Sequence, residues 1–143
     1  MPTDFRTELE KTGRIVFTCK GVSMMPLLRQ NKDIMVIDKA APPYRRKDAV
    51  LFIRDNGQYV MHRITKVLDG KRYCITGDNC FAGETVREEQ IIGILKEVHR
   101  NGRAVRVTDP GYRLYVLAVP LLRGVKKLRR AGGRVLRKLH LKQ

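Results

Sequence analysis

Ala49-Val-Leu-Phe-Ile-Arg-Asp-Asn-Gly-Gln-Tyr-Val-Met-His-Arg-Ile-Thr-Lys-Val67 occupies the middle of this 143-residue chain, and its pattern identifies the kind of fold. Residues 49–53 and 59–67 are rich in apolar, β-branched and aromatic side chains, which favour strands. Between them, Asn56 and Gly57 tolerate the positive φ angles that a tight hairpin turn needs. The stretch therefore predicts two antiparallel strands joined by a short turn.

The same pattern continues on both sides of this hairpin. Asp69-Gly70 and Asn101-Gly102 are further turn signals of the same type. Strands are expected over residues 15–20, 34–38, 72–76, 91–99 and 104–107, and a short helix over residues 5–12. Short strands separated by such turns indicate a mainly β protein, with one antiparallel β domain over residues 1–111.

Beyond Gly111 the pattern becomes helical. Apolar residues recur at three- and four-residue steps, with Lys and Arg between them: Leu114, Leu117, Leu121, Val125 and Leu128. Gly132-Gly133 is expected to interrupt this helix. Residues 112–143 therefore read as a basic amphipathic helical tail that follows the β domain.

The charge of the chain is concentrated in this tail. The whole chain carries 30 Lys and Arg against 14 Asp and Glu, a net charge of +16. Residues 112–143 contain ten basic and no acidic residues, so they account for +10 of that charge. A basic segment attracts polyanions, of which nucleic acid and anionic lipid are the two common ones.

Aromatic content separates these two partners. Binders of single-stranded nucleic acid stack bases on surface aromatics, whereas this chain has no Trp and only 6% aromatic residues. Nucleic acid is thus not expected as a partner. The hypothesis for residues 112–143 is an anionic membrane surface, and the alternative is that residues 114–128 pack on the β domain.

Cysteine usage and apolar runs bear on the compartment. Cys19, Cys74 and Cys80 have no metal-ligand spacing, and their odd number favours reduced thiols in the cytosol. No metal or cofactor is expected. The run 114–122 is too short to span a bilayer, which takes about 20 apolar residues. We expect a cytoplasmic protein, at most peripheral on the cytoplasmic face of a membrane, because no signal peptide or N-terminal anchor is recognisable.

Gly21-Val-Ser-Met-Met-Pro26 carries the clearest chemical signal. Its serine needs a base to become a nucleophile. The stretch resembles the Gly-x-Ser-Met-x-Pro box of the signal peptidase and SOS-repressor peptidase clan. Three further segments resemble that clan's elements in the same order: Lys47-Asp-Ala-Val-Leu-Phe52, Tyr59-Val-Met-His-Arg-Ile64 and Thr76-Gly-Asp-Asn79. The resemblance covers about residues 15–98, and it implies that clan's antiparallel β fold with Ser23 as nucleophile.

His62 stands where many members of the clan have a lysine base. This looks like the Ser-His branch that includes the endoplasmic-reticulum signal peptidases. An imidazole with an ordinary pKa near 6.5 can accept a proton at neutral pH. Two acids compete for the third position: Glu84, near the place of that branch's triad aspartate, and Asp78 in the Gly-Asp-Asn turn. We expect Glu84 to orient the imidazole and Asp78 to support the structure.

The resemblance implies a serine endopeptidase that cuts precursor peptides or proteins. Two alternatives remain open at this point. The first is self-cleavage, as in the SOS repressors, for which Ala82-Gly83 and Ala131-Gly132 are candidate bonds. The second is an inactive peptidase fold that serves as a basic module binding lipid or nucleic acid.

Overall fold

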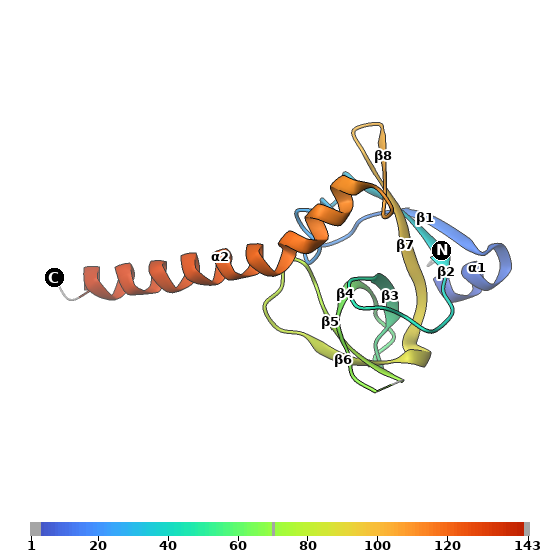
Figure 1. Ribbon diagram of the computed structural model, residues 1–143, viewed down its shortest axis with the longest axis horizontal. Coiled ribbons are helices and arrows are strands. Elements are labelled where there is room, and N and C mark those ends of the chain that lie inside the picture. The colour runs from blue at the N-terminus through green and yellow to red at the C-terminus, as the bar shows by residue number, and fades with distance from the viewer. Residues whose placement is uncertain (1–3, 70, 142–143) are drawn as a thin grey trace.

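The chain is mainly β, as expected. A computed structural model describes residues 4–69 and 71–141, with side chains described as far as residue 133. Its elements are α1 (Phe5–Thr12), β1 (Arg14–Thr18), β2 (Ile34–Lys39), β3 (Ala49–Ile53), β4 (Tyr59–Val67), β5 (Arg72–Thr76), β6 (Glu84–Arg87), the 3₁₀ turn η1 (Glu88–Gln90), β7 (Ile91–Arg100), β8 (Arg103–Arg106) and α2 (Pro110–Leu141). In Figure 1 the strands curve around a common centre and α2 extends away from them as a long rod.

All strand pairs are antiparallel. The order across the sheet is β1-β2-β7-β3-β4-β5-β6, and β8 pairs with β7. The hairpin of the central stretch is confirmed: β3 and β4 pair with Val50 opposite His62, across a turn in which Gly57 has a φ of 87°. Both strands therefore place His62 in the interior of the sheet.

Three local expectations need correction. The first strand ends at Thr18, two residues before the expected end, because Cys19 and Lys20 already belong to the loop that carries Ser23. The strand β6 was not expected, since it has only four residues and two of them are charged. Gly132-Gly133 does not interrupt α2, because a glycine inside a helix costs only about 1 kcal/mol relative to alanine.

The core lies on both sides of the central strands. Leu51 of β3 belongs to a cluster with Leu9, Met24, Leu28 and Ile37, and its neighbours Val50 and Phe52 belong to a second cluster with Ile64, Tyr73 and Ile75. Successive residues of a strand point to opposite faces, so both faces of β3 are covered. The neighbouring strand β4, which carries His62, is thus held in a rigid setting.

Asp33 fixes the loop that follows Ser23. Its buried carboxylate accepts hydrogen bonds from the Arg29 backbone N–H at 2.8 Å and from the Arg100 guanidinium at 3.1 Å. Burial alone would raise the pKa of Asp33, but the hydrogen bonds from Arg29 and Arg100 lower it to about 2. Arg100 also donates to the Leu27 carbonyl oxygen at 3.1 Å. Asp33 therefore has a structural role in positioning residues 24–33.

The first part of α2 packs against the β domain. Tyr112, Val116 and Val119 are buried, and they lie at the i, i+4, i+7 spacing of one helix face. Residues 114–128 thus do contact the β domain, as the alternative expected, but through Val116, Val119 and Arg123. The leucines that defined the helical pattern are exposed instead. Packing consequently continues past residue 111. Over residues 4–69 and 71–141, no helix is both long enough and apolar enough to cross a bilayer.

Candidate active site

Ser23 lies in the loop between β1 and β2. The side chains of Met24 and Leu28, which follow it, are buried in the core, and the Cys19 N–H donates to the Asp33 carbonyl oxygen at 2.9 Å to close the base of the loop. Gly21 has a φ of 79°, a left-handed conformation that favours glycine. This conformation explains why a glycine stands two positions before the serine. Ser23 is half-buried at the surface of this anchored turn.

His62 reaches the same place from β4. Its imidazole is buried, and its ring lies edge-on to Phe52 with 6.1 Å between ring centroids. Ser23 and His62 line one pocket of about 480 Å³, whose walls also include Tyr59, Asn79 and Cys80. Two residues far apart in the sequence thus face one cavity.

The Gly77–Asn79 turn braces this arrangement. The Asn79 N–H donates to the Ser23 carbonyl oxygen at 2.8 Å, and the Asn79 side-chain amide donates to the Val22 carbonyl oxygen at 2.9 Å. A Cβ atom at Gly77 would lie 2.6 Å from the Ser23 carbonyl oxygen and 3.1 Å from His62 Cδ2. Only glycine permits such a close approach, so the Gly-Asp-Asn element sets the position of the serine backbone beside the imidazole.

The Ser23 hydroxyl and the imidazole are not hydrogen-bonded to each other within the described part of the chain. They share the pocket without being paired. Catalytic hydrogen bonds are often long in the free enzyme and tighten only when substrate is bound.

The two candidate acids have different surroundings. Glu84 Oε1 lies 4.0 Å from His62 Nδ1, which is adjacent but beyond hydrogen-bond length, and it accepts a 2.7 Å hydrogen bond from Arg54 Nη2. Asp78 has a fully buried carboxylate that accepts from Arg63 at 2.8 and 2.9 Å and from the Tyr115 hydroxyl at 2.7 Å. Glu84 is therefore the acid beside the imidazole, and Asp78 ties β4 to α2.

Several residues around the site have no signal in the sequence. Arg54 follows β3, whereas Tyr115, Arg123 and Lys126 belong to α2. Arg123 donates to the Gly77 carbonyl oxygen at 3.2 Å, and Lys126 donates to the Asn79 side-chain oxygen. These contacts form only when elements far apart in the sequence come together, so no local sequence pattern predicts them.

The surroundings of His62 favour its neutral form. Burial, the largest influence, lowers the pKa of His62, and the positive charges of Arg54 and Arg123 lower it too, while Glu84 and Asp78 act in the opposite direction. The net shift is downward from 6.5. The imidazole is consequently unprotonated at neutral pH and able to accept a proton.

The two charges of the Arg54–Glu84 ion pair should shift the pKa of His62 in opposite directions, which can be tested by substitution. Arg54→Gln removes a nearby positive charge and should raise the pKa of His62, whereas Glu84→Gln removes a negative charge and should lower it. The pH at which the imidazole loses its proton should therefore move up in Arg54→Gln and down in Glu84→Gln. Titration of the His62 ring protons by NMR measures the same shifts directly.

Arg87→Gln is the matched control for this experiment. Arg87 pairs with Asp55 and Glu89 on the exposed side of β6, so its removal should leave the His62 titration unchanged. Shifts of the same sign in Arg54→Gln and Glu84→Gln would contradict the electrostatic description.

Cysteine, histidine and acidic side chains are the groups that could carry metal or thiol chemistry. Across residues 4–69 and 71–141, His, Cys, Asp and Glu do not gather in threes at positions that could hold a metal ion. Cys19, Cys74 and Cys80 are free thiols, and Cys80 Sγ lies 3.9 Å from the Ser23 carbonyl oxygen. Burial raises the pKa of Cys19, which makes that thiol a poor nucleophile.

Comparison of the chain with models of known protein families gives no match. A search of curated proteins gives no match either.

Proposed function

We propose that this protein is a serine endopeptidase that cuts peptides or precursor proteins with Ser23 as nucleophile and His62 as general base. The observation that carries the proposal is the shared pocket of Ser23 and His62, in which the imidazole is buried and neutral and Glu84 lies beside its Nδ1 atom. A base in this state can activate a hydroxyl that is otherwise a poor nucleophile.

The reaction follows from these positions. Ser23 Oγ attacks the carbonyl carbon of the scissile bond while His62 takes the hydroxyl proton, and the charged imidazole then protonates the leaving amine. The resulting ester on Ser23 is hydrolysed by a water molecule that His62 deprotonates in turn. The Glu84 carboxylate stabilises the imidazolium that forms in each half of the reaction, and Arg54 holds that carboxylate in place.

The charge on the carbonyl oxygen needs a hydrogen-bond donor. The resemblance to the peptidase clan implies that the Ser23 N–H is one such donor. Such a donor is typically worth about 3 kcal/mol in the transition state. The free thiols agree with a reducing compartment, so a cytoplasmic peptidase is part of the proposal.

Covalent trapping of the acyl-enzyme tests this function. The p-nitrophenyl ester of N-acetylalanine supplies a small acyl group, and intact-mass measurement should show one added acyl group that maps to Ser23. Ser23→Ala should form no such adduct. Incubation with a complex peptide mixture should then give new peptide termini with the wild-type protein and none with Ser23→Ala.

The thiols require a control in this experiment, because Cys80 lines the same pocket. Cys80→Ala should keep the adduct, and neutral hydroxylamine, which removes thioesters, should leave it in place. An adduct of equal yield in Ser23→Ala would refute Ser23 as the nucleophile. Fragments of the untreated protein whose masses match a cut at Ala82-Gly83 or Ala131-Gly132 would instead identify self-cleavage.

A further inference from the structure

Two opposite faces of the helix α2 have different surroundings. One face holds the β domain through buried Tyr112, Val116 and Val119, and it ends where Arg123 and Lys126 contact the Gly77–Asn79 turn. Figure 1 shows the remainder of α2 extending away from the strands. Only one side of this helix is therefore used in the fold.

The opposite face is an exposed apolar stripe, formed by Leu114, Leu117, Leu121, Val125 and Leu128. The four leucines are between 61% and 74% exposed. An α-helix turns by about 100° per residue, so these positions share one side, half a turn from Tyr112 and Val119. Single exposed leucines are ordinary, but five aligned apolar residues on one face indicate a surface that meets another apolar phase.

Basic residues border the apolar stripe on both sides. Arg113 and Arg129 are exposed and lie at its two edges, and residues 110–143 contain no acidic residue. A second copy of this chain would bring the same positive charge to the stripe and be repelled. An anionic surface complements it, and an apolar face bordered by Lys and Arg is typical of helices that lie in a lipid interface.

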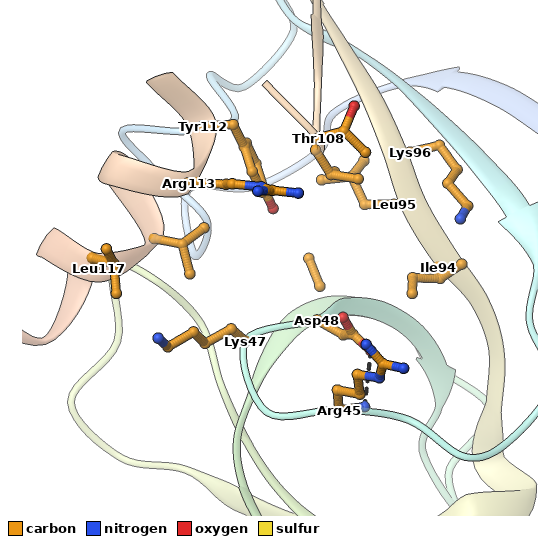
Figure 2. A pocket seen from close by; sticks show the side chains of 13 residues that line it. Arg45, Lys47, Asp48, Ile94, Leu95, Lys96, Thr108, Tyr112, Arg113 and Leu117 are labelled. Carbon is orange, nitrogen blue, oxygen red and sulfur yellow. Dashed lines mark hydrogen bonds between the residues drawn. The ribbon is translucent and has the colours of Figure 1, made fainter. Parts of the chain in front are cut away.

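A basic pocket opens beside the apolar stripe and adds to this surface. The pocket has a volume of about 600 Å³, and Figure 2 shows it between α2, β7 and the loop before β3. Its interior includes Ile94 and Val116, and its cationic residues are Arg45, Lys47, Lys96 and Arg113. The acid among its lining residues, Asp48, accepts a 2.9 Å hydrogen bond from the Arg45 N–H. Such a cavity suits a phosphate group attached to an apolar chain.

We propose that the apolar stripe of α2 and the basic pocket together bind the surface of a bilayer that contains anionic phospholipid. The stripe enters the interface, the flanking Lys and Arg meet the headgroups, and the basic pocket receives a lipid phosphate. This binding does not depend on the peptidase reaction.

Co-sedimentation of the full chain with vesicles tests the proposal. The protein should sediment with phosphatidylcholine vesicles that contain phosphatidylglycerol, and much less with phosphatidylcholine alone. Leu117→Asp/Leu121→Asp should weaken partitioning about a hundredfold, because two apolar side chains no longer enter the interface. The full chain is essential, since truncation before α2 would also remove Tyr115 from Asp78.

Val16→Asp/Val67→Asp is the matched control. Both valines are exposed on the β domain, so the double substitution adds the same negative charge outside α2 and should leave binding near the wild-type level. Lys47→Gln/Lys96→Gln tests the basic pocket separately and should weaken vesicle binding about tenfold. Added salt should then weaken the binding of this variant less than it weakens the binding of the wild type.

Three results would overturn the proposal. The first is equal vesicle binding by wild type and Leu117→Asp/Leu121→Asp. The second is a leucine-dependent dimer without vesicle binding, which would identify a second copy as the occupant. The third is DNA binding that is unchanged in the leucine variant and unaccompanied by vesicle binding, which would show attraction of polyanions by charge alone.

Discussion

His62→Ala should slow the acylation of Ser23 by about 10²- to 10⁴-fold, the usual contribution of a positioned general base. This corresponds to about 3 to 5 kcal/mol of transition-state stabilisation. The reason is that the hydroxyl proton then loses the neutral imidazole as its acceptor, and the two nearby carboxylates are already engaged, Glu84 by Arg54 and Asp78 by Arg63. The burst of p-nitrophenolate released from the alanine ester measures the rate.

The pH profile strengthens this test. Because the pKa of His62 is lowered from 6.5, the wild-type rate should rise across a range below 6.5 and level off near neutrality. His62→Ala should lose that plateau and rise continuously with hydroxide. His99→Ala is the control: His99 lies on β7 next to Glu97 at 3.1 Å and should keep the wild-type rate. A rate within a few-fold of wild type in His62→Ala would exclude the imidazole as base.

Asp78→Ala should destabilise the protein by about 3 to 5 kcal/mol, because it leaves the Arg63 guanidinium buried without its partner. The effect is large compared with the roughly 5 to 15 kcal/mol by which a domain is usually stable. Burial would lower the pKa of Arg63, but the hydrogen bonds with Asp78 raise it, so the arginine stays charged and cannot escape the loss by deprotonating. The midpoint of urea unfolding measures the change.

Companion variants keep this prediction testable if Asp78→Ala does not fold. Tyr115→Phe removes one hydrogen bond to the same carboxylate and should cost about 1.5 to 3 kcal/mol. Arg63→Met/Asp78→Leu removes both charges and should recover much of the loss. Asp38→Ala breaks a partly exposed ion pair with Arg14 and should cost less than about 1 kcal/mol. Equal losses in Asp78→Ala and Asp38→Ala would contradict the structural role of Asp78.

Much of the β domain can be predicted because its signals are local. Residues 49–53, 59–67 and 72–76 coincide with strands, since Asx-Gly turns mark where each strand must end. β6 escapes prediction because pairing with β5, and not its own composition, makes it a strand. The positions of Ser23 and His62 beside each other follow from the pairing of distant segments, so only the resemblance of several ordered boxes anticipated them.

The orientation of α2 shows a different limit. The leucine pattern predicted a helix correctly, but the helix has a second apolar face, Tyr112, Val116 and Val119, that docks on the domain. The periodicity of a helix with two apolar sides does not say which side faces the core. Similarly, only the resemblance separates Glu84 from Asp78 in the sequence. Their different partners, Arg54 for Glu84 and Arg63 with Tyr115 for Asp78, come together only in the fold.

The contacts between α2 and the Gly77–Asn79 turn have a consequence in terms of linked equilibria. The turn donates a hydrogen bond to the Ser23 backbone and receives one from Arg123. If a ligand on α2 changes the affinity of the Ser23–His62 pocket for its own ligand, its own affinity must change by the same factor when that pocket is occupied. A tenfold factor corresponds to about 1.4 kcal/mol, within the range of one hydrogen bond. Binding on α2 and binding in the Ser23–His62 pocket would then be linked equilibria, and measuring the affinity of one site with the other empty and then full gives the coupling.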